Sequence, residues 1–293
     1  MKLPMLFAKT LRLMVYRYPT DFFVYLLRDR LRKWFPDKDI ITSTKENFKM
    51  VVSPHDYISY GIFFFGIYDR QMTNFMKMYI PENGTCFDVG AGWGWFTLLM
   101  ASLVGPNGRV DSFEAFPPNF RKLETSISLN GFVCVKVNNL AVNNKLGKIY
   151  FVPPSDDITQ HIKYLNDCSG IGYITPQRVE GSIEVTTISL DQYVESQQIK
   201  RLDLIKLDIE GSEYSALVGA KKMIGKFRPI IIVEYNRGTS QRAGTSIREL
   251  DQLLDSYGYD RFTFSNELEK LILENWENRP GNDVVFNVYC FPR

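Results

Sequence analysis

From residue 85 onward, short apolar runs alternate with amphipathic segments in a regular order. The apolar runs predict strands at 85–90, 109–115, 132–142, 202–211 and 228–236. The segments between and after them predict helices at 94–104, 117–131, 213–226 and 245–258. Strands that alternate with helices in this way form a parallel sheet covered on both faces. The pattern therefore predicts an α/β fold with a doubly wound, mostly parallel sheet.

Both ends of the chain depart from this rhythm. Near the C-terminus, "RFTFSN" and "DVVFNVYCF" have no helix between them and predict an antiparallel hairpin at the sheet edge. Before residue 81, the pattern predicts a helix after Thr20, a strand at 48–52 and helical segments from 56 to 79. We therefore expect an N-terminal helical extension over 1–80 and a sheet domain over 81–293.

A long interruption at 143–188 separates the third and fourth predicted strands of the sheet. A loop of this length inside an α/β domain is uncommon unless it is functional. We expect residues from about 153 to 181 to form an insertion that covers a substrate.

Composition and charge bear on the partners and the cellular compartment of the protein. The 293 residues carry a formal net charge of +2, which gives no support for nucleic acid as a partner. The four cysteines are scattered without metal-ligand spacing, so we expect reduced thiols and a cytoplasmic location. No secretory signal and no apolar run long enough for a membrane span are evident.

The first 38 residues carry nine basic and three acidic side chains, and four of the basic ones crowd the polar side of a predicted helix with one apolar face. That face holds Phe23, Leu27, Leu31 and Trp34. A basic amphipathic helix can lie on an anionic membrane surface. A cap packed on the sheet domain, or a homodimer contact, is the alternative that we favour.

The stretch "FDVGAGWGWFT" carries the first candidate chemistry. Gly90, Gly92 and Gly94 follow Asp88 at every second position, between a predicted strand and a helix. The dinucleotide-binding pattern G-x-G-x-x-G needs a small residue at position 95, which is tryptophan. The spacing G-x-G-x-G is instead typical of class I S-adenosylmethionine (SAM) methyltransferases. The alternative is a tight turn that serves packing alone.

Acidic residues follow several of the predicted strands. Glu114 ends the second one, where a carboxylate can bind both hydroxyls of a ribose, in SAM or in NAD. Asp208 and Glu210 lie two apart at the end of the fourth strand, so strand alternation predicts that they share a face. Glu213 lies one turn into the next helix, and Glu234 ends the fifth strand.

These carboxylates have several interpretations. A hydroxyl acceptor needs a general base, which Asp208 can supply. Glu213 could instead stabilise the helix N-terminus, and the group could hold Mg²⁺, although we expect no metal. His55 and His161 are alternative bases. The run "HDYISYGIFFFGIYD" could cover the cofactor or acceptor with aromatic side chains, but its three consecutive phenylalanines favour core packing.

A family resemblance becomes specific in the segments between about 55 and 236. "FDVGAGWGWFT", "FEAFPPNFRKLETSISLNGF", "TTISLDQYV", "LDLIKLDIEGSEYSALVGAKKMI" and "RPIIIVEYN" resemble, in order and spacing, the FkbM family of SAM-dependent methyltransferases. Gly92 stands where that family usually has asparagine. The resemblance implies a Rossmann-like fold with SAM as cofactor. It implies that SAM is bound by Asp88, Gly90, Ala91, Gly92, Glu114 and Ala115, and that its adenine is flanked by Asn139, Leu140 and Ala141.

The resemblance also implies O-methylation of a hydroxyl on a sugar, polyketide or other secondary metabolite. We expect Asp208 to act as general base, Glu210 to orient the acceptor and Glu213 to support the adjoining helix. N-methylation of peptide side chains is one alternative, because an amide nitrogen also needs a base. A module that binds SAM or a related nucleoside without turnover is the other. The expected partner is a small-molecule, glycan or peptide acceptor.

Overall fold

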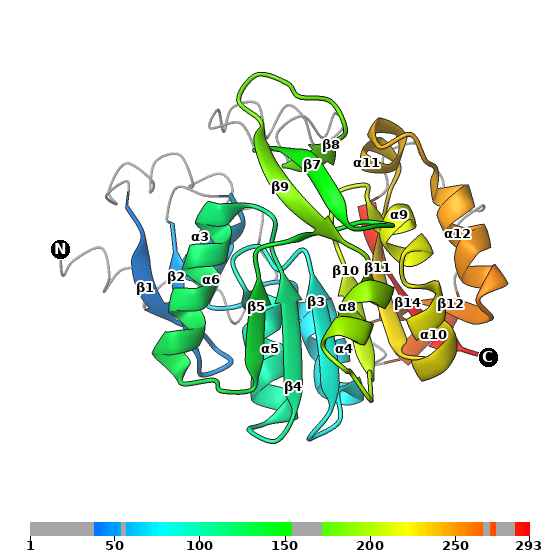
Figure 1. Cartoon of the computed structure of the whole chain (residues 1–293). Coiled ribbons are helices and arrows are strands. Elements are labelled where there is room, and N and C mark those ends of the chain that lie inside the picture. Colours follow the sequence, from blue (N-terminus) through cyan, green and yellow to red (C-terminus); the bar gives the residue numbers. More distant parts are fainter. Residues whose placement is uncertain (1–37, 54–56, 154–171, 266–269, 274–284) are drawn as a thin grey trace.

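The computed structural model describes residues 38–53, 57–153, 172–265, 270–273 and 285–293. Within these residues, eight strands form a central sheet in the order β13-β12-β14-β11-β10-β3-β4-β5 (Figure 1). Five neighbouring strands run parallel to one another. They are β3 (Thr85–Val89), β4 (Arg109–Phe113), β5 (Val135–Asn138), β10 (Leu204–Leu207) and β11 (Ile230–Asn236). The predicted α/β class and mostly parallel sheet are confirmed.

The C-terminal part of the sheet is antiparallel, as predicted, but its strand order differs from a simple hairpin. β14 (Val285–Pro292) lies between β11 and β12 (Tyr259–Ser265) and pairs antiparallel with both. A further strand, β13 (Lys270–Leu273), forms the edge. β14 takes the inner position because Val288, Tyr289 and Cys290 are fully buried, which requires cover on both sides.

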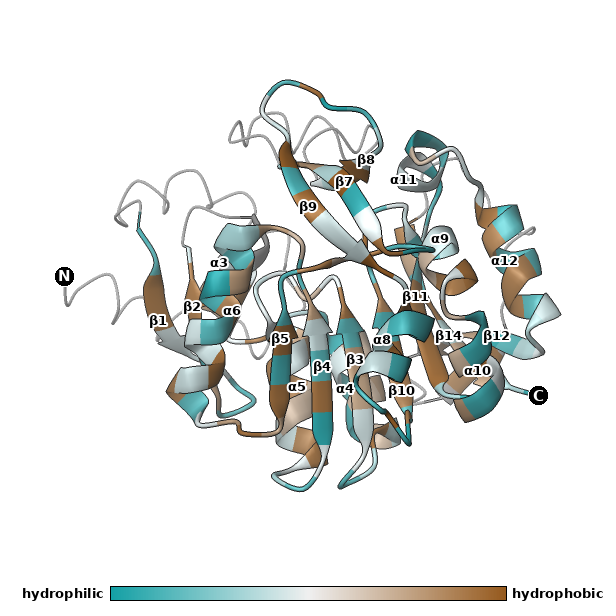
Figure 2. Cartoon of the chain, viewed as in Figure 1, coloured by the Kyte–Doolittle hydropathy of each residue, from teal (hydrophilic) through white to brown (hydrophobic). Residues whose placement is uncertain are grey.

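Two helical layers cover the sheet, each over its own apolar cluster. One layer contains α4 (Arg70–Tyr79), α5 (Trp95–Val104) and α6 (Pro117–Asn130). The other contains α8 (Leu190–Ser196), α9 (Glu213–Val218), α10 (Lys221–Phe227) and α12 (Ile247–Ser256). Figure 2 shows the apolar residues along the inner strands and the polar residues on outward helix faces. This arrangement is the predicted doubly wound one.

The described part of the N-terminal region packs into the same core as the sheet. The predicted strand and helical segments correspond to β2 (Lys49–Val52), α3 (Tyr57–Phe65) and α4. β1 (Ile40–Ser43), which pairs antiparallel with β2, was not predicted. Phe63 and Phe64 are buried, which confirms the core-packing interpretation of the phenylalanine run. The helix predicted after Thr20 lies outside the described residues.

The interruption at 143–188 contains most of a second, four-stranded sheet in the described residues. Its strands are β6 (Ala141–Val142), β7 (Gly147–Val152), β8 (Tyr173–Thr175) and β9 (Ile183–Ile188). Their order is β6-β9-β7-β8, and Figure 1 shows this sheet standing over one end of the central sheet. Residues 154–171 of the expected insertion lie outside the described part of the chain.

Two smaller expectations concern cysteines and membrane spans. Cys86, Cys134 and Cys290 are free thiols, as expected. Among the residues with described placement, no helix has the length and apolar character needed to cross a membrane.

Candidate cofactor and acceptor site

The glycine turn between β3 and α5 is hydrogen-bonded to β4 and packs closely against the end of β10. The backbone N–H groups of Gly90 and Ala91 each donate to the carbonyl of Phe113, at 3.0 Å. A Cβ at position 90 would lie 1.9 Å from the carbonyl oxygen of Asp208, so a side chain there has no space. At Gly92, where φ is +54°, a Cβ would meet nothing within 4 Å. The turn therefore offers its open side to a ligand at Gly92.

Glu114, which directly follows β4, lies beside this opening. Its Oε2 accepts from the Gly92 N–H at 2.7 Å and its Oε1 from the Phe116 N–H at 2.8 Å. The residue is 6% exposed. Burial raises the pKa of Glu114 to about 7, although these two backbone hydrogen bonds oppose the shift. Each oxygen keeps a second lone pair for a ligand, so the carboxyl fits the two hydroxyls of a ribose.

The segment predicted to flank an adenine is hydrogen-bonded to the backbone of Glu114. The Asn139 side-chain amide donates to the carbonyl of Glu114 at 2.8 Å and to that of Ala115 at 3.2 Å. Leu140 packs against one of the two apolar clusters, and Ala141 is buried at the start of β6. The opening at Gly92, the Glu114 carboxyl and this segment together fit an adenosine, although each residue's contact with the cofactor stays a prediction.

Lys206, in the middle of β10, was not singled out from the sequence. It is 2% exposed, and its Nζ lies 3.3 Å from Asp208 Oδ2 and 3.5 Å from Asp88 Oδ1. It also donates to the Gly90 carbonyl at 3.3 Å. Burial lowers the pKa of Lys206, but Asp208 and Asp88 more than offset this, so the pKa is raised and the ammonium stays charged. Thr97 Oγ1 donates to the other oxygen of Asp88 at 2.6 Å.

A sequence signal for Lys206 exists. It is the one charged position within the apolar run Leu-Ile-Lys-Leu of β10, two residues before Asp208. A lysine in a fully buried strand needs an anionic partner, because a buried unpaired charge is costly. Asp88 and Asp208 are those partners, so Lys206 links the strand before the glycine turn to the proposed base.

Asp208 and Glu213 differ in what their carboxylates can still bind. The Asp208 side chain is 29% exposed and follows the last residue of β10. Glu213, 2% exposed, accepts from the N–H of Ile209 at 2.8 Å and from that of Gly211 at 2.9 Å. Burial raises the pKa of Glu213 to about 7. Glu213 thus holds the turn before α9, which supports its expected role beside the helix, whereas Asp208 remains accessible.

Glu210 lies in a turn and not, as predicted, in the strand that precedes it. β10 ends at Leu207, and Glu210 lies in the following turn with a left-handed backbone, φ 56°. Strand alternation therefore does not extend to it, and the prediction that alternation places Asp208 and Glu210 on one face is wrong. Asp208 nevertheless acts on Glu210 electrostatically: burial, and then the charge of Asp208, raises the pKa of Glu210.

The N-terminal region contributes Tyr68 and Asp69 to this edge. Burial, followed by the negative charges of Asp208 and Asp69, raises the pKa of Tyr68. Asp69 caps α4 by accepting from the Met72 N–H at 2.9 Å, and its other oxygen accepts from the Asn287 amide at 3.2 Å. The aromatic run quoted from the sequence ends in Asp69, but neither Asp69 nor Asn287 was assigned a role from the sequence.

The second sheet touches the site on two sides. The rings of Phe116 and Phe151, on β7, stack with centroids 5.4 Å apart. The Arg242 guanidinium, at the end of α11 (Arg237–Arg242), lies 4.1 Å from the centre of the Tyr173 ring on β8. Arg242 also donates to the Glu210 carbonyl at 3.3 Å. These contacts place the second sheet beside both the Glu114 loop and the acidic turn.

Two alternatives from the sequence concern a metal ion and a histidine base. The described residues contain no group of three or more His, Cys, Asp or Glu side chains arranged to hold a metal ion. His55 and His161 lie outside the described residues. Their proposed role as bases therefore stays a prediction.

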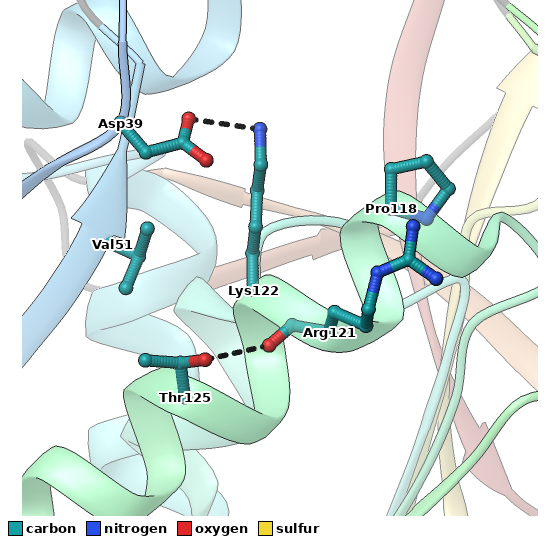
Figure 3. Close-up of a pocket in the computed structure, with 6 residues that line it drawn as sticks. All are labelled: Asp39, Val51, Pro118, Arg121, Lys122 and Thr125. Carbon is teal, nitrogen blue, oxygen red and sulfur yellow. Dashed lines mark hydrogen bonds and ion pairs between the residues drawn. The ribbon is translucent and has the colours of Figure 1, made fainter.

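A cavity of about 340 Å³ lies elsewhere, between the β1–β2 hairpin and α6 (Figure 3). Lys122 crosses it, 3.0 Å from Asp39 and 3.9 Å from the centre of the Trp93 ring. Its lining includes none of Glu114, Asp208, Glu210 and Glu213, and none of the three glycines of the turn. The cavity is thus not the candidate site itself, but Lys122 connects the two, because Trp93 lies in the glycine turn between Gly92 and Gly94.

The methyltransferase FkbM domain matches residues 84–261, which include the glycine turn, Glu114 and the acidic turn. The antimetabolite synthetase AmbE of Pseudomonas aeruginosa is 23% identical over 232 residues, covering 70% of this chain and 10% of that protein. The 2-O-methyltransferase NoeI of Sinorhizobium fredii is 25% identical over 134 residues, covering 42% and 52%.

A third relative, Methyltransferase 1 of Beauveria bassiana, is 24% identical over 149 residues, covering 47% of this chain and 59% of that protein. The chain thus spans less than two thirds of the length of each of these relatives. A solved FkbM methyltransferase of Methylobacillus flagellatus aligns with 15% identity and a TM-score of 0.45, covering 71% of this chain and 44% of that one.

Proposed function

Because this chain belongs to the FkbM methyltransferase family, we propose that it transfers a methyl group from SAM to a hydroxyl group of a small-molecule or glycan acceptor. The family, the class of enzyme and the cofactor predicted from the sequence are confirmed by this membership. The acceptor and the residues that act on it belong to the proposal.

The cofactor side of the proposal is built on Gly92, Glu114 and Asn139. When bound, SAM supplies an electrophilic methyl group on a sulfonium ion. Gly92 leaves space for the ligand, and the Glu114 carboxylate receives the ribose hydroxyls. Asn139 fixes the loop that carries Glu114 to the segment beside the expected adenine. These residues bind and orient, and alignment of this kind can lower a barrier by up to about 7–11 kcal/mol.

The acceptor side rests on one observation, the carboxylate of Asp208 at the end of β10. Its backbone adjoins the glycine turn at Gly90, and its side chain is reachable from solvent. Lys206 holds this carboxylate in place through an ion pair of 3.3 Å. Asp208 would accept the proton that a hydroxyl loses as its oxygen gains the methyl group, a role that typically contributes about 10²–10⁴-fold to the rate. The name of the relative NoeI, a 2-O-methyltransferase, agrees with a hydroxyl acceptor.

Transfer of a ¹³C-methyl group tests the proposal directly. The protein is incubated with [methyl-¹³C]SAM and a panel of monosaccharides, polyhydroxylated small molecules and short peptides, and products are identified by mass spectrometry and NMR. We expect the label on an oxygen atom of a small molecule. Transfer should be lost in Asp208→Asn and should be unchanged in the control Glu195→Gln on α8.

Two results would replace this proposal with an alternative. Label on a peptide nitrogen would identify an N-methyltransferase. Tight SAM binding without transfer to any acceptor, including a metabolite extract, would favour a module that binds the cofactor without turnover.

A further inference from the structure

One carboxylate oxygen beside the proposed base has no partner. Glu210 Oε2 is shielded from solvent and accepts no hydrogen bond within the described part of the chain. Buried carboxylate oxygens are normally paired, because losing water without gaining a donor is costly. The backbone of Glu210 is also held in the left-handed region, φ 56°, which side-chain-bearing residues rarely adopt. The turn thus presents an acceptor atom to something that is not part of it.

Glu234, near the end of β11, is the second carboxylate in this place. It receives a long hydrogen bond, 3.4 Å, from the side-chain amide of Asn236. Burial raises the pKa of Glu234 most, and the negative charges of Asp208 and Glu210 raise it further. Burial and Asp208 raise the pKa of Glu210 in the same way. The parallel pairing of Leu207 with Val233 places Glu234 beside the start of the turn that carries Asp208 and Glu210. Two half-buried carboxyls in such a place do not both ionise easily, so we expect the pair to share a proton before a ligand binds.

The cations nearest to the pair are engaged elsewhere. Lys206 forms ion pairs with Asp88 and Asp208. Arg242 lies over the Tyr173 ring and donates to the backbone carbonyl of Glu210. The charged and titratable groups that act on this place from the surrounding elements are Tyr68, Asp69, Asp88, Lys206, Asp208, Glu213 and Arg242. Acidic groups outnumber basic ones here, so the site favours a cation.

We propose that Glu210 and Glu234 bind an ammonium group that the acceptor carries close to the hydroxyl facing Asp208. The acceptor class is then an amino alcohol or amino sugar, methylated on oxygen and held through nitrogen. This inference rests on the proposed function and adds the recognition element to it.

The chemistry of an ammonium suits this pair. An ammonium has N–H donors for the orphan oxygen of Glu210 and for Glu234, and its positive charge offsets one of the two negative charges of the ionised pair. On binding, the proton shared by the pair leaves to the buffer, so one positive charge enters as another departs. The acceptor hydroxyl then keeps Asp208 as its own base.

Binding of three related probes to the full chain saturated with S-adenosylhomocysteine (SAH) tests the inference. Methyl glucosaminide carries the ammonium, methyl N-acetylglucosaminide has it neutralised, and methyl glucoside has a hydroxyl in its place. At pH 7 we expect the ammonium probe to bind at least about tenfold more tightly than the other two, the lower end for a charge-assisted hydrogen bond. Calorimetry in two buffers of different ionisation enthalpy should show release of about one proton.

Two variants and a control separate recognition from folding. Glu210→Gln and Glu234→Gln should each reduce the preference for the ammonium probe to about threefold or less and abolish proton release, while SAH still binds. Glu195→Gln, on the exposed side of α8, should change neither. SAH binding also confirms that each variant is folded.

Equal binding of the three probes, no binding of the ammonium probe, or a preference unchanged in both glutamine variants would overturn the inference. The proposed function would survive each of these results if a neutral hydroxyl acceptor is methylated in an Asp208-dependent way. Methylation of the probe on its nitrogen would also overturn the inference, because the ammonium would then be the acceptor and not the anchor.

Discussion

Alanine substitution at Gly90 and at Gly92 separates packing from cofactor binding within one turn. At Gly90, φ is +79°, and an added Cβ would lie 1.9 Å from the Asp208 carbonyl oxygen and 2.9 Å from Ile209 Cγ2. The left-handed conformation costs a non-glycine residue about 1–2 kcal/mol. Overpacking adds about 1–3 kcal/mol. We therefore expect Gly90→Ala to lower the free energy of unfolding by about 2–5 kcal/mol.

At Gly92 the same substitution meets open space. Its φ is +54° and no atom lies within 4 Å of the added Cβ, so we expect only the conformational cost of about 1–2 kcal/mol. The Cβ would, however, stand on the side of the turn that faces the proposed cofactor, beside Glu114. We expect the Kd for SAH to rise at least about tenfold, or 1.4 kcal/mol.

Urea unfolding without ligand and calorimetric titration with SAH measure the two effects independently. The stability comparison uses the urea midpoint at a common slope, since a changed slope would signal a different unfolding transition. The reasoning is refuted if Gly90→Ala unfolds like the unaltered protein. It is equally refuted if Gly92→Ala binds SAH with unchanged affinity, because the open side of the turn would then not be the cofactor side.

Three further substitutions address the charged groups. Asp208→Asn should reduce turnover at least about 100-fold while SAH binding persists; turnover within threefold of normal would move the base elsewhere. Lys206→Met leaves Asp88 and Asp208 without their ammonium and should lower the free energy of unfolding by about 3–5 kcal/mol, and a urea midpoint like that of the unaltered protein would contradict the pairing. The pKa of Glu114 is raised from 4.5 to about 7, so its contribution to stability is full below pH 4.5 and is lost, by about 3 kcal/mol, as the pH rises to 7. The affinity for SAH should rise over the same pH range, because the Glu114 carboxylate forms there. Glu114→Gln should remove the pH dependence of both stability and SAH affinity. If the pH dependence is unchanged in that variant, another group causes it.

The parallel core was predictable because its strands are buried on both faces and read as apolar runs. "TCFDVG" and "RPIIIVEYN" became β3 and β11 for that reason, and the glycines between β3 and α5 marked the turn without reference to the fold. Glu114 and Asp208 were found because each follows such a run directly. At strand ends, sequence position is nearly enough to place a side chain.

The rest depends on contacts that local pattern does not carry. The role of Lys206 depends on its ion pair with Asp88. The two residues are more than a hundred positions apart and meet only through the parallel pairing of their strands. Glu210 was assigned by alternation, which fails where the backbone turns left-handed after Leu207. The strands of the second sheet are short and only partly buried, so their hydrophobic signal is weak.

The hydrogen bond between Asp69 and Asn287 joins residues 218 positions apart and sets an order in time during synthesis. At about 5–20 residues per second, roughly 10–40 s pass on the ribosome between the two. The glycine turn and Glu114 are made early in this interval, whereas β14, which carries Asn287 and pairs with β11 beside Glu234, is made at its end. A nascent chain can thus contain the whole glycine turn well before the sheet edge beside Glu234 is assembled. Translational pausing before β14 would prolong exposure of the uncovered β11, a strand edge open to pairing with other chains.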